Sequence, residues 1–300
     1  MNAELIARRE RDVLIGSQSP TEIMQSIPLS GIHKKLKSGD NLAKMILLRD
    51  GCVTIKSVLS KRCADSLSDY VNREKLDSEK AVALGLAEYD SRFGAVNNRR
   101  NRADMFLSYS QPIVQEALVE VTRNLSPLLD DMENMLSFGS LHELSSIISD
   151  PGSPTQCLHC DTPYLASIAP LYTFFVALQD VDDDMGHTTF LPGTHTEAAH
   201  KIFNGPMRQK DELISKASSV HSQLRVGDVA VFDSRILHAG GANQSKDKRR
   251  ILFYFTFTAG DVERNNPNPK RGSGSILEGD RLQHSWSEFS VSMGTEGPGK

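Results

Sequence analysis

The chain has 300 residues, of which 39% are hydrophobic, and its formal net charge is -4. This length and hydrophobic content suffice for one large domain or two small ones with a substantial buried core, which argues against a disordered chain. The acidic balance argues against a nucleic-acid-binding protein, because such domains carry a basic excess that neutralises phosphates.

The cysteine content indicates the cellular setting. The four cysteines are too few and too scattered for a disulfide scaffold, which favours a reducing compartment. The first twelve residues carry charges where a secretory signal is apolar, and no later run reaches the length that spans a membrane. We therefore expect a cytoplasmic protein, with the reservation that an organellar transit peptide is removed from some mature chains.

The first third of the chain predicts helices around one strand. Residues 1–45 are polar with scattered apolar positions, and we expect a helical N-terminal extension there. Within residues 45–56, Asp50-Gly51 marks a tight turn that leads into a strand. Ser60 is the predicted N-cap of a helix that continues to about Glu74.

A second helix is predicted from Pro112 to Thr122, because its apolar residues recur at helical spacing and proline suits a first turn. The chain then becomes rich in β-branched and aromatic residues. Turn pairs such as Pro192-Gly193 and Gly240-Gly241 separate short apolar runs, which are predicted strands at 173–178, 188–191, 229–232 and 251–258.

Several short strands with such punctuation predict a mainly β fold with surrounding helices, arranged as a sandwich or jelly roll. Residues 261–300 are rich in Asn, Pro, Gly and Ser and are expected to form a loop-rich tail. Because no repeat and no linker divides the chain, we predict a single domain over residues 1–300.

A metal site is predicted from two ligand types at strand spacing. His159 and Asp161 are two residues apart, so on a strand both side chains point to the same face. Iron(II) oxygenases use two imidazoles and one carboxylate on one face of the metal and leave the opposite positions open. His238, at the end of a predicted strand and before Ala239-Gly240-Gly241, is the best second histidine.

An arginine pair, Arg249-Arg250, opens the strand that follows His238. A hairpin returns one of the two guanidinium groups to the metal cavity, where an arginine is able to clamp a carboxylate in a bidentate manner. Since adjacent strand residues face opposite sides, only one of the two enters the cavity.

The ordered set His159-x-Asp161, His238 and Arg249 resembles the phytanoyl-CoA dioxygenase-like (PhyH) family of iron(II)- and 2-oxoglutarate-dependent oxygenases. The likeness covers roughly residues 45–260. Further pieces agree with the family pattern, namely Asp50-Gly51-Cys52-Val53, Gln156 three residues before the first ligand, the segment 188–195 and the segment 238–243.

This resemblance implies a double-stranded β-helix, a cupin-like jelly roll, with iron near one open end. It implies His159, Asp161 and His238 as iron ligands, with 2-oxoglutarate and dioxygen as the other cofactors. It also implies that Arg249 binds the far carboxylate of 2-oxoglutarate, with Gln156 and Thr188 as helpers, and leaves Arg250 as the alternative.

The resemblance further implies oxidation of a C–H bond of a small metabolite by hydroxylation, desaturation or oxidative cyclisation in specialised biosynthesis. Halogenating relatives replace the ligand carboxylate with a small residue, so Asp161 argues against halogenation. In oxidative members a basic residue before the helix that corresponds to Pro112 reaches the site. Arg102 sits at that place, and we expect Arg102 and Arg250 to bind a carboxylate of the substrate.

The expected partners are a small-molecule substrate, with no nucleic acid and no membrane, and the expected assembly is a monomer or homodimer. The main alternative function is a non-enzymatic or zinc-binding cupin-like jelly roll. An arginine at the Arg249 position argues against it, because a plain binding barrel does not need a carboxylate clamp. Cys157 and Cys160 match a C-x-x-C pattern, but no second pair completes a zinc site and both are expected to pack outside the barrel.

Overall fold

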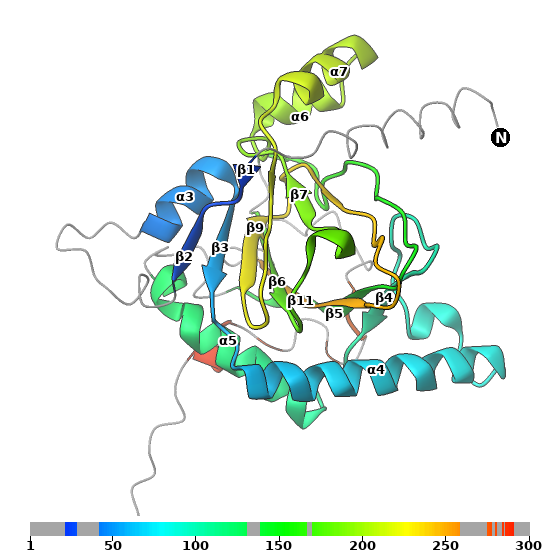
Figure 1. Ribbon diagram of the computed structural model, residues 1–300. Helices are drawn as coiled ribbons and strands as arrows, with labels where there is room; N and C mark the ends of the chain where they lie inside the picture. The colour runs from blue at the N-terminus through cyan, green and yellow to red at the C-terminus, as the bar shows by residue number, and fades with distance from the viewer. Residues whose placement is uncertain are drawn as a thin grey trace, which may run out of the picture.

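Two β-sheets form the centre of the computed structural model, which describes residues 22–28, 42–130, 139–166, 170–258, 275–277, 280, 284 and 286–290. The larger sheet has seven strands in the order β2-β3-β9-β6-β11-β5-β4, and the smaller has four in the order β1-β8-β7-β10 (Figure 1). Neighbours in each sheet come from distant parts of the chain, as a jelly roll requires.

The bounds of the strands are as follows. The larger sheet contains β2 (Ser26–Pro28), β3 (Cys52–Lys56), β9 (Val229–Asp233), β6 (Leu171–Ala177), β11 (Arg250–Thr258), β5 (Leu141–Ser149) and β4 (Arg102–Phe106). The smaller sheet contains β1 (Glu22–Ile23), β8 (Val220–His221), β7 (Thr188–Phe190) and β10 (His238–Gly240).

Strand β11 shows how the larger sheet separates a hydrophobic core from a cavity. Its odd-numbered residues, including Phe253, Phe255 and Phe257, belong to the main hydrophobic core. Its even-numbered residues Arg250, Leu252 and Tyr254 line a cavity on the other face. The alternation follows from the period of two residues in a strand.

Helices cover the core side of the larger sheet. Helices α4 (Lys61–Ala83) and α5 (Pro112–Asp130) pack against each other and lie across this face (Figure 1). The Ser60 side chain accepts a hydrogen bond from the Cys63 N–H and caps α4. The other helices are α3 (Leu42–Asp50), α6 (Glu197–Phe203), α7 (Met207–Lys216), α9 (Trp286–Ser290) and the 3-10 turns Tyr89–Ser91 and Asp183–Met185.

Most predicted elements occur where the pattern placed them. The helix capped by Ser60, the helix that begins at Pro112 and the four predicted strands are all present. Among the described residues, no helix combines the length and the apolar character of a membrane-spanning segment.

The observed elements differ from the expected ones in three places. Within the predicted helical extension, residues 22–28 form strands β1 and β2, which bury Met24 and Ile27 against β8 and β3; the remainder before residue 42 lies outside the described residues. In the predicted loop-rich tail, α9 is a helix that buries Trp286 and Phe289 against the core. Strands β4 and β5 were not predicted at all.

Candidate metal and cosubstrate site

The three predicted metal ligands converge on one point. His159 and His238 are held side by side by two backbone hydrogen bonds, of 3.0 Å and 2.8 Å, between their N–H and C=O groups. Asp161 is fixed by its N–H, which donates to the Ser234 carbonyl at 2.9 Å. The Asp161 Oδ1 atom lies 3.7 Å from His159 Nε2 and 3.8 Å from His238 Nε2.

The backbone also orients both imidazoles. His159 Nδ1 lies 2.8 Å from the Cys157 carbonyl, and His238 Nδ1 lies 3.1 Å from the Ile236 carbonyl. A carbonyl only accepts, so each Nδ1 carries the proton and each Nε2 presents a lone pair toward Asp161. One ligand atom from each side chain lies within 4.8 Å of the others, which is the donor set of a two-histidine, one-carboxylate site.

These ligands border a cavity of about 390 Å³ between the two sheets. Its lining includes Gln156, Thr188, Arg250 and Tyr254 beside apolar side chains such as Phe175 and Leu252. A concave site with a few convergent polar groups is typical of a small-molecule site.

Arg250 is a buried cation of this cavity that lacks hydrogen-bond acceptors. It is 2% exposed, and its Nη2 donates to Ser149 Oγ at 3.1 Å, while Nε and Nη1 have no hydrogen-bond partner in the described structure. Burial, with Arg102 nearby, lowers the pKa of Arg250 to about 9. A bound carboxylate would supply both the missing acceptors and the missing counter-charge.

The distance from the metal ligands to Arg250 suits a short diacid. A Cβ atom added at Gly240 would lie 3.4 Å from Arg250 Nη2 and 2.4 Å from Gln156 Oε1, so the side chains of Arg250 and Gln156 both lie against strand β10 at Gly240. Gly240 is two residues beyond His238, a rise of about 7 Å along the strand. A five-carbon 2-oxoacid reaches from the ligand triad to Arg250 over such a span.

Arg249 does not enter the cavity, so the expectation that it clamps the cosubstrate from inside the barrel is wrong. Its Nε donates to Asp150 Oδ1 and its Nη1 donates to Asn72 Oδ1 at 2.7 Å, with 35% of the side chain exposed. Strand β11 begins one residue later, at Arg250, and alternation turns Arg249 outward toward α4. Arg250, predicted for the substrate and as the alternative clamp for the cosubstrate, is the arginine of the pair that lines the cavity.

Gln156 and Thr188 border the cavity as expected. Gln156 Oε1 accepts from the Gly240 N–H at 3.0 Å, which ties the segment before His159 to strand β10. Thr188 is buried on β7 directly opposite Gly240. Gln156 therefore meets Arg250 at Gly240, and Thr188 stands opposite the same glycine on the neighbouring strand.

Arg102 lies behind the cavity wall and not in it. Its Nη2 donates to the carbonyls of Pro154 and Gly241 at 2.8 Å and 3.3 Å, and its Nε donates to Ser149 Oγ at 3.2 Å. Burial lowers the pKa of Arg102 to about 10. The predicted contact between Arg102 and a substrate carboxylate has no support in this placement.

Other cavity residues escaped the sequence prediction. Asp104 and Glu143 are 2% and 5% exposed and line the cavity from β4 and β5. Cys160 also lines it, although we expected that thiol outside the barrel. The one available signal was the set Glu143, Ser145 and Ser149, which share one face of the strand Leu141–Ser149 because side chains alternate with a period of two residues.

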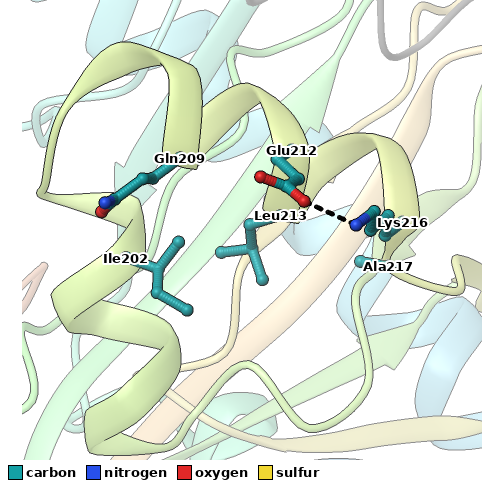
Figure 2. A pocket seen from close by; sticks show the side chains of 6 residues that line it. All are labelled: Ile202, Gln209, Glu212, Leu213, Lys216 and Ala217. Atoms are coloured by element: carbon teal, nitrogen blue, oxygen red, sulfur yellow. Dashed lines mark hydrogen bonds and ion pairs between the residues drawn. The ribbon is translucent and has the colours of Figure 1, made fainter.

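A second hollow, of about 570 Å³, lies on helix α7 and is lined by Ile202, Gln209, Glu212, Leu213, Lys216 and Ala217 (Figure 2). Its charged residues, Glu212 and Lys216, pair with each other at 2.5 Å. It is larger than the metal cavity, but it has no convergent ligand atoms and no buried charge. We therefore assign the chemistry to the cavity between the sheets.

Comparison with known proteins agrees with this geometry. The dioxygenase aneA of Aspergillus aculeatus is 24% identical over 226 residues, which are 68% of this chain and 67% of that protein. The iron/alpha-ketoglutarate-dependent dioxygenase ausU of Aspergillus calidoustus is 26% identical over 220 residues, which are 69% of this chain and 67% of that protein. Neither relative supports the alternative of a non-enzymatic binding protein.

Solved structures confirm the predicted jelly roll. HygX from Streptomyces hygroscopicus, crystallised with nickel, 2-oxoglutarate and hygromycin B, has a TM-score of 0.52 at 15% identity and covers 83% of this chain and 99% of its own. The family model of phytanoyl-CoA dioxygenase matches residues 47–251, which is more than half of the chain. The predicted enzyme class, an iron(II)- and 2-oxoglutarate-dependent dioxygenase, is thereby confirmed, and the chain belongs to the phytanoyl-CoA dioxygenase (PhyH) family.

Proposed function

We propose that this enzyme oxidises a C–H bond of a small metabolite, with iron(II) held by His159, Asp161 and His238 and 2-oxoglutarate held by Arg250. The observation that carries the proposal is the buried guanidinium of Arg250, which lacks partners at two nitrogens and lies beside Gly240, two residues beyond His238. When bound, iron and 2-oxoglutarate activate dioxygen, and the cosubstrate leaves as succinate and carbon dioxide.

The chain's own residues prepare this site before any ligand binds. Carbonyl groups fix the tautomer of both histidines, so no proton has to leave Nε2 when a metal binds. The rings of Phe190 and Phe232 pack on His238 with centroid distances of 5.7 Å and 5.1 Å. They hold the imidazole in place and exclude water from its back face.

Asp161 decides between two outcomes of such chemistry. Its carboxylate occupies the position that halogenating enzymes of this fold leave to chloride, so we propose oxygenation, desaturation or oxidative cyclisation and no halogenation. The four free cysteines suit a reducing compartment, and we place the enzyme in the cytoplasm on that ground. The organisation as a single domain, in a monomer or homodimer, stays a prediction.

The test is to measure succinate and carbon dioxide formed from 2-oxoglutarate by purified protein with and without added iron(II). Metal content and Mn(II) affinity are measured in parallel for His159→Ala, Asp161→Ala and His238→Ala. We expect each variant to lose metal binding and turnover, whereas His195→Ala, a histidine outside the cavity, should keep both.

Two results would contradict the proposal. Normal metal binding by His238→Ala would remove the ligand assignment. Tight metal binding without any turnover of 2-oxoglutarate would favour the zinc-binding jelly roll over the oxygenase.

A further inference from the structure

Residues 95–102, which we call the rim, run along the mouth of the active-site cavity. Four of them line the cavity, namely Ala95, Val96, Asn97 and Arg99. Among the described lining residues, Arg99 and Arg250 are the two that carry a permanent positive charge. Arg250 is buried inside, whereas Arg99 is exposed, so Arg99 is the cation that a molecule meets as it enters.

The guanidinium of Arg99 is held in place without being neutralised. It forms no ion pair within the described part of the chain, and its contact is with the ring of Tyr89, whose centre lies 5.0 Å from Arg99 Cζ. Tyr89 stacks on Phe93 at a centroid distance of 4.9 Å, and Phe93 is 3% exposed within the main hydrophobic core. A cation on an aromatic ring keeps its charge and its N–H donors available to an anion.

The acidic side chains of the neighbouring elements pair with other cations. Asp150, at the end of β5 beside the rim, pairs with Arg249 and with Lys75, whose Nζ lies 3.4 Å away. Glu74 on α4 lies 3.6 Å from Arg92 Nη1. These carboxylates are therefore neutralised without Arg99.

The backbone of the rim has a fixed conformation around Arg99. Asn98 and Asn101 have φ values of +61° and +51°, a left-handed conformation that is uncommon outside glycine. The Asn101 side chain donates to the Pro151 carbonyl at 2.8 Å, and the Arg102 N–H donates to the Arg99 carbonyl at 3.1 Å. Such a backbone persists only where its surroundings fix it, so the position of Arg99 is set before a ligand binds.

Hydrogen bonds also tie the rim to the metal site. Gln156 joins it to strand β10, because its Nε2 donates to the Asn97 carbonyl at 3.4 Å and its Oε1 accepts from the Gly240 N–H at 3.0 Å. Arg102, the last residue of the rim, donates through Nη2 to the Gly241 carbonyl at 3.3 Å. These bonds fix the rim relative to strand β10, which carries one of the three metal ligands.

The rest of the lining suits an apolar body of limited size. Val96, Phe175 and Leu252 present apolar side chains to the cavity, whose volume of about 390 Å³ holds a small molecule. A cosubstrate on Arg250 uses the inner cation. The substrate is therefore left with Arg99 as the arginine available to it among the described lining residues.

We infer that the substrate carries an oxyanion, a carboxylate or a phosphate, which Arg99 binds at the cavity mouth while the apolar part of the molecule extends toward the metal ligands. The fork of N–H donors on an arginine matches either oxyanion. This inference rests on the proposed function for the place of the cosubstrate on Arg250. It keeps the expected acidic substrate but moves its recognition from Arg102 and Arg250 to Arg99.

The test uses three probes of similar shape: cyclohexanecarboxylate, cyclohexyl phosphate and cyclohexanol. Each is titrated by ligand-observed NMR into the chain with zinc and 2-oxoglutarate bound, so that Arg250 is occupied. We expect at least one of the two acids to bind about fivefold more tightly than the alcohol, which is the effect of an exposed ion pair. The tighter acid identifies the preferred oxyanion. Absence of any preference for an acid, including the case in which none of the three binds, would overturn the inference.

Variants assign the preference to Arg99. Arg99→Gln should abolish it, and Arg99→Lys should retain part of it because the charge remains without the fork. Arg100→Gln is the matched control, since Arg100 is the exposed neighbour in the rim and is not among the described lining residues. A preference that survives in Arg99→Gln, or that Arg100→Gln removes to the same extent, would overturn the assignment.

A second background separates this inference from the proposed function. The probes are also titrated into Arg250→Met protein without metal or cosubstrate, in which an acid has Arg99 and no inner arginine to bind. Failure of zinc-loaded wild type to bind 2-oxoglutarate would refute the proposed function. A preference for acids in Arg250→Met that the added Arg99→Gln change removes would still support the inference, and its absence there would refute it.

Discussion

Replacing Arg250 with methionine should move two measured quantities in opposite directions. Burial lowers the pKa of Arg250 from its ordinary value to about 9, so its burial as a cation opposes folding by on the order of 5 kcal/mol. Replacing buried ionic groups with well-packed hydrophobic side chains of similar volume is often neutral or stabilises a protein by about 1–4 kcal/mol. The unliganded Arg250→Met protein should therefore be as stable as the wild type or more stable.

Binding of 2-oxoglutarate should respond in the other direction. Removing one partner of a buried, hydrogen-bonded charge pair costs about 2–5 kcal/mol, which corresponds to an increase in Kd of about 30-fold to 4,000-fold. Arg249→Met is the matched control, because that side chain is half-buried and pairs with Asp150 on the outside. It should lose up to about 1 kcal/mol of stability and bind 2-oxoglutarate within twofold of the wild type.

Urea denaturation of metal-free protein and calorimetric titration of 2-oxoglutarate into zinc-loaded protein give the two quantities. The reasoning is refuted if Arg249→Met weakens 2-oxoglutarate more than Arg250→Met does. It is also refuted if Arg250→Met destabilises the empty protein and binds the cosubstrate normally, since the guanidinium would then be structural.

Three further predictions test the surroundings of the site. Burial raises the folded-state pKa of Asp104 to about 6 against an ordinary 3.8, so its contribution to stability is present below about pH 4 and is lost as the pH rises through 6. Urea denaturation at pH 4 and at pH 6.5 measures this decline in the free energy of unfolding, and Asp104→Asn should remove on the order of 3 kcal/mol of it. The same difference in unfolding free energy between the two pH values in wild type and variant would contradict the prediction. Gly240→Ala should raise the Kd of 2-oxoglutarate several-fold, because the new Cβ displaces Gln156 and presses on Arg250, and normal affinity would argue against the assigned cosubstrate position. Gly186→Ala should lower the free energy of unfolding by about 2–4 kcal/mol, because Gly186 has a φ of +75° and the new Cβ would lie 2.2 Å from the Ala242 carbonyl oxygen. A loss below about 1 kcal/mol in urea denaturation would contradict this and would mean that the backbone at Gly186 relaxes.

Two of the three candidate metal ligands could be brought together from the sequence because their spacing is local. His159 and Asp161 are two residues apart, and the backbone bonds that join His159 to His238 follow from extended chain at both places. His238 was singled out by its position at the end of a predicted strand, and the family resemblance then joined it to the other two residues. The same short-range logic explains why the Ser60 cap and the β11 strand were found.

The choice between Arg249 and Arg250 depended on a single residue of register. Alternation requires that only one of them faces the cavity, but the sequence does not state at which residue the strand begins. The partners of Arg249 decide it. Asp150 at the end of β5 and Asn72 on α4 hold that side chain outside, and both are distant in sequence.

Strands β4 and β5 were not predicted because polar residues stand on the face that they turn toward the cavity. A strand on a hydrophobic core is recognised by apolar residues at alternate positions, but these two strands turn Asp104, Glu143 and Ser145 toward the inside of the barrel. The polar residues look like a solvated face in the sequence, although the structure buries them almost completely. Burying such groups weakens a fold unless partners offset the cost, and here hydroxyl groups of Ser145, Tyr254 and Thr256 are among those partners. A strand whose inward face is polar therefore gives no apolar alternation in the sequence, although the structure buries it as completely as the strands that face the hydrophobic core.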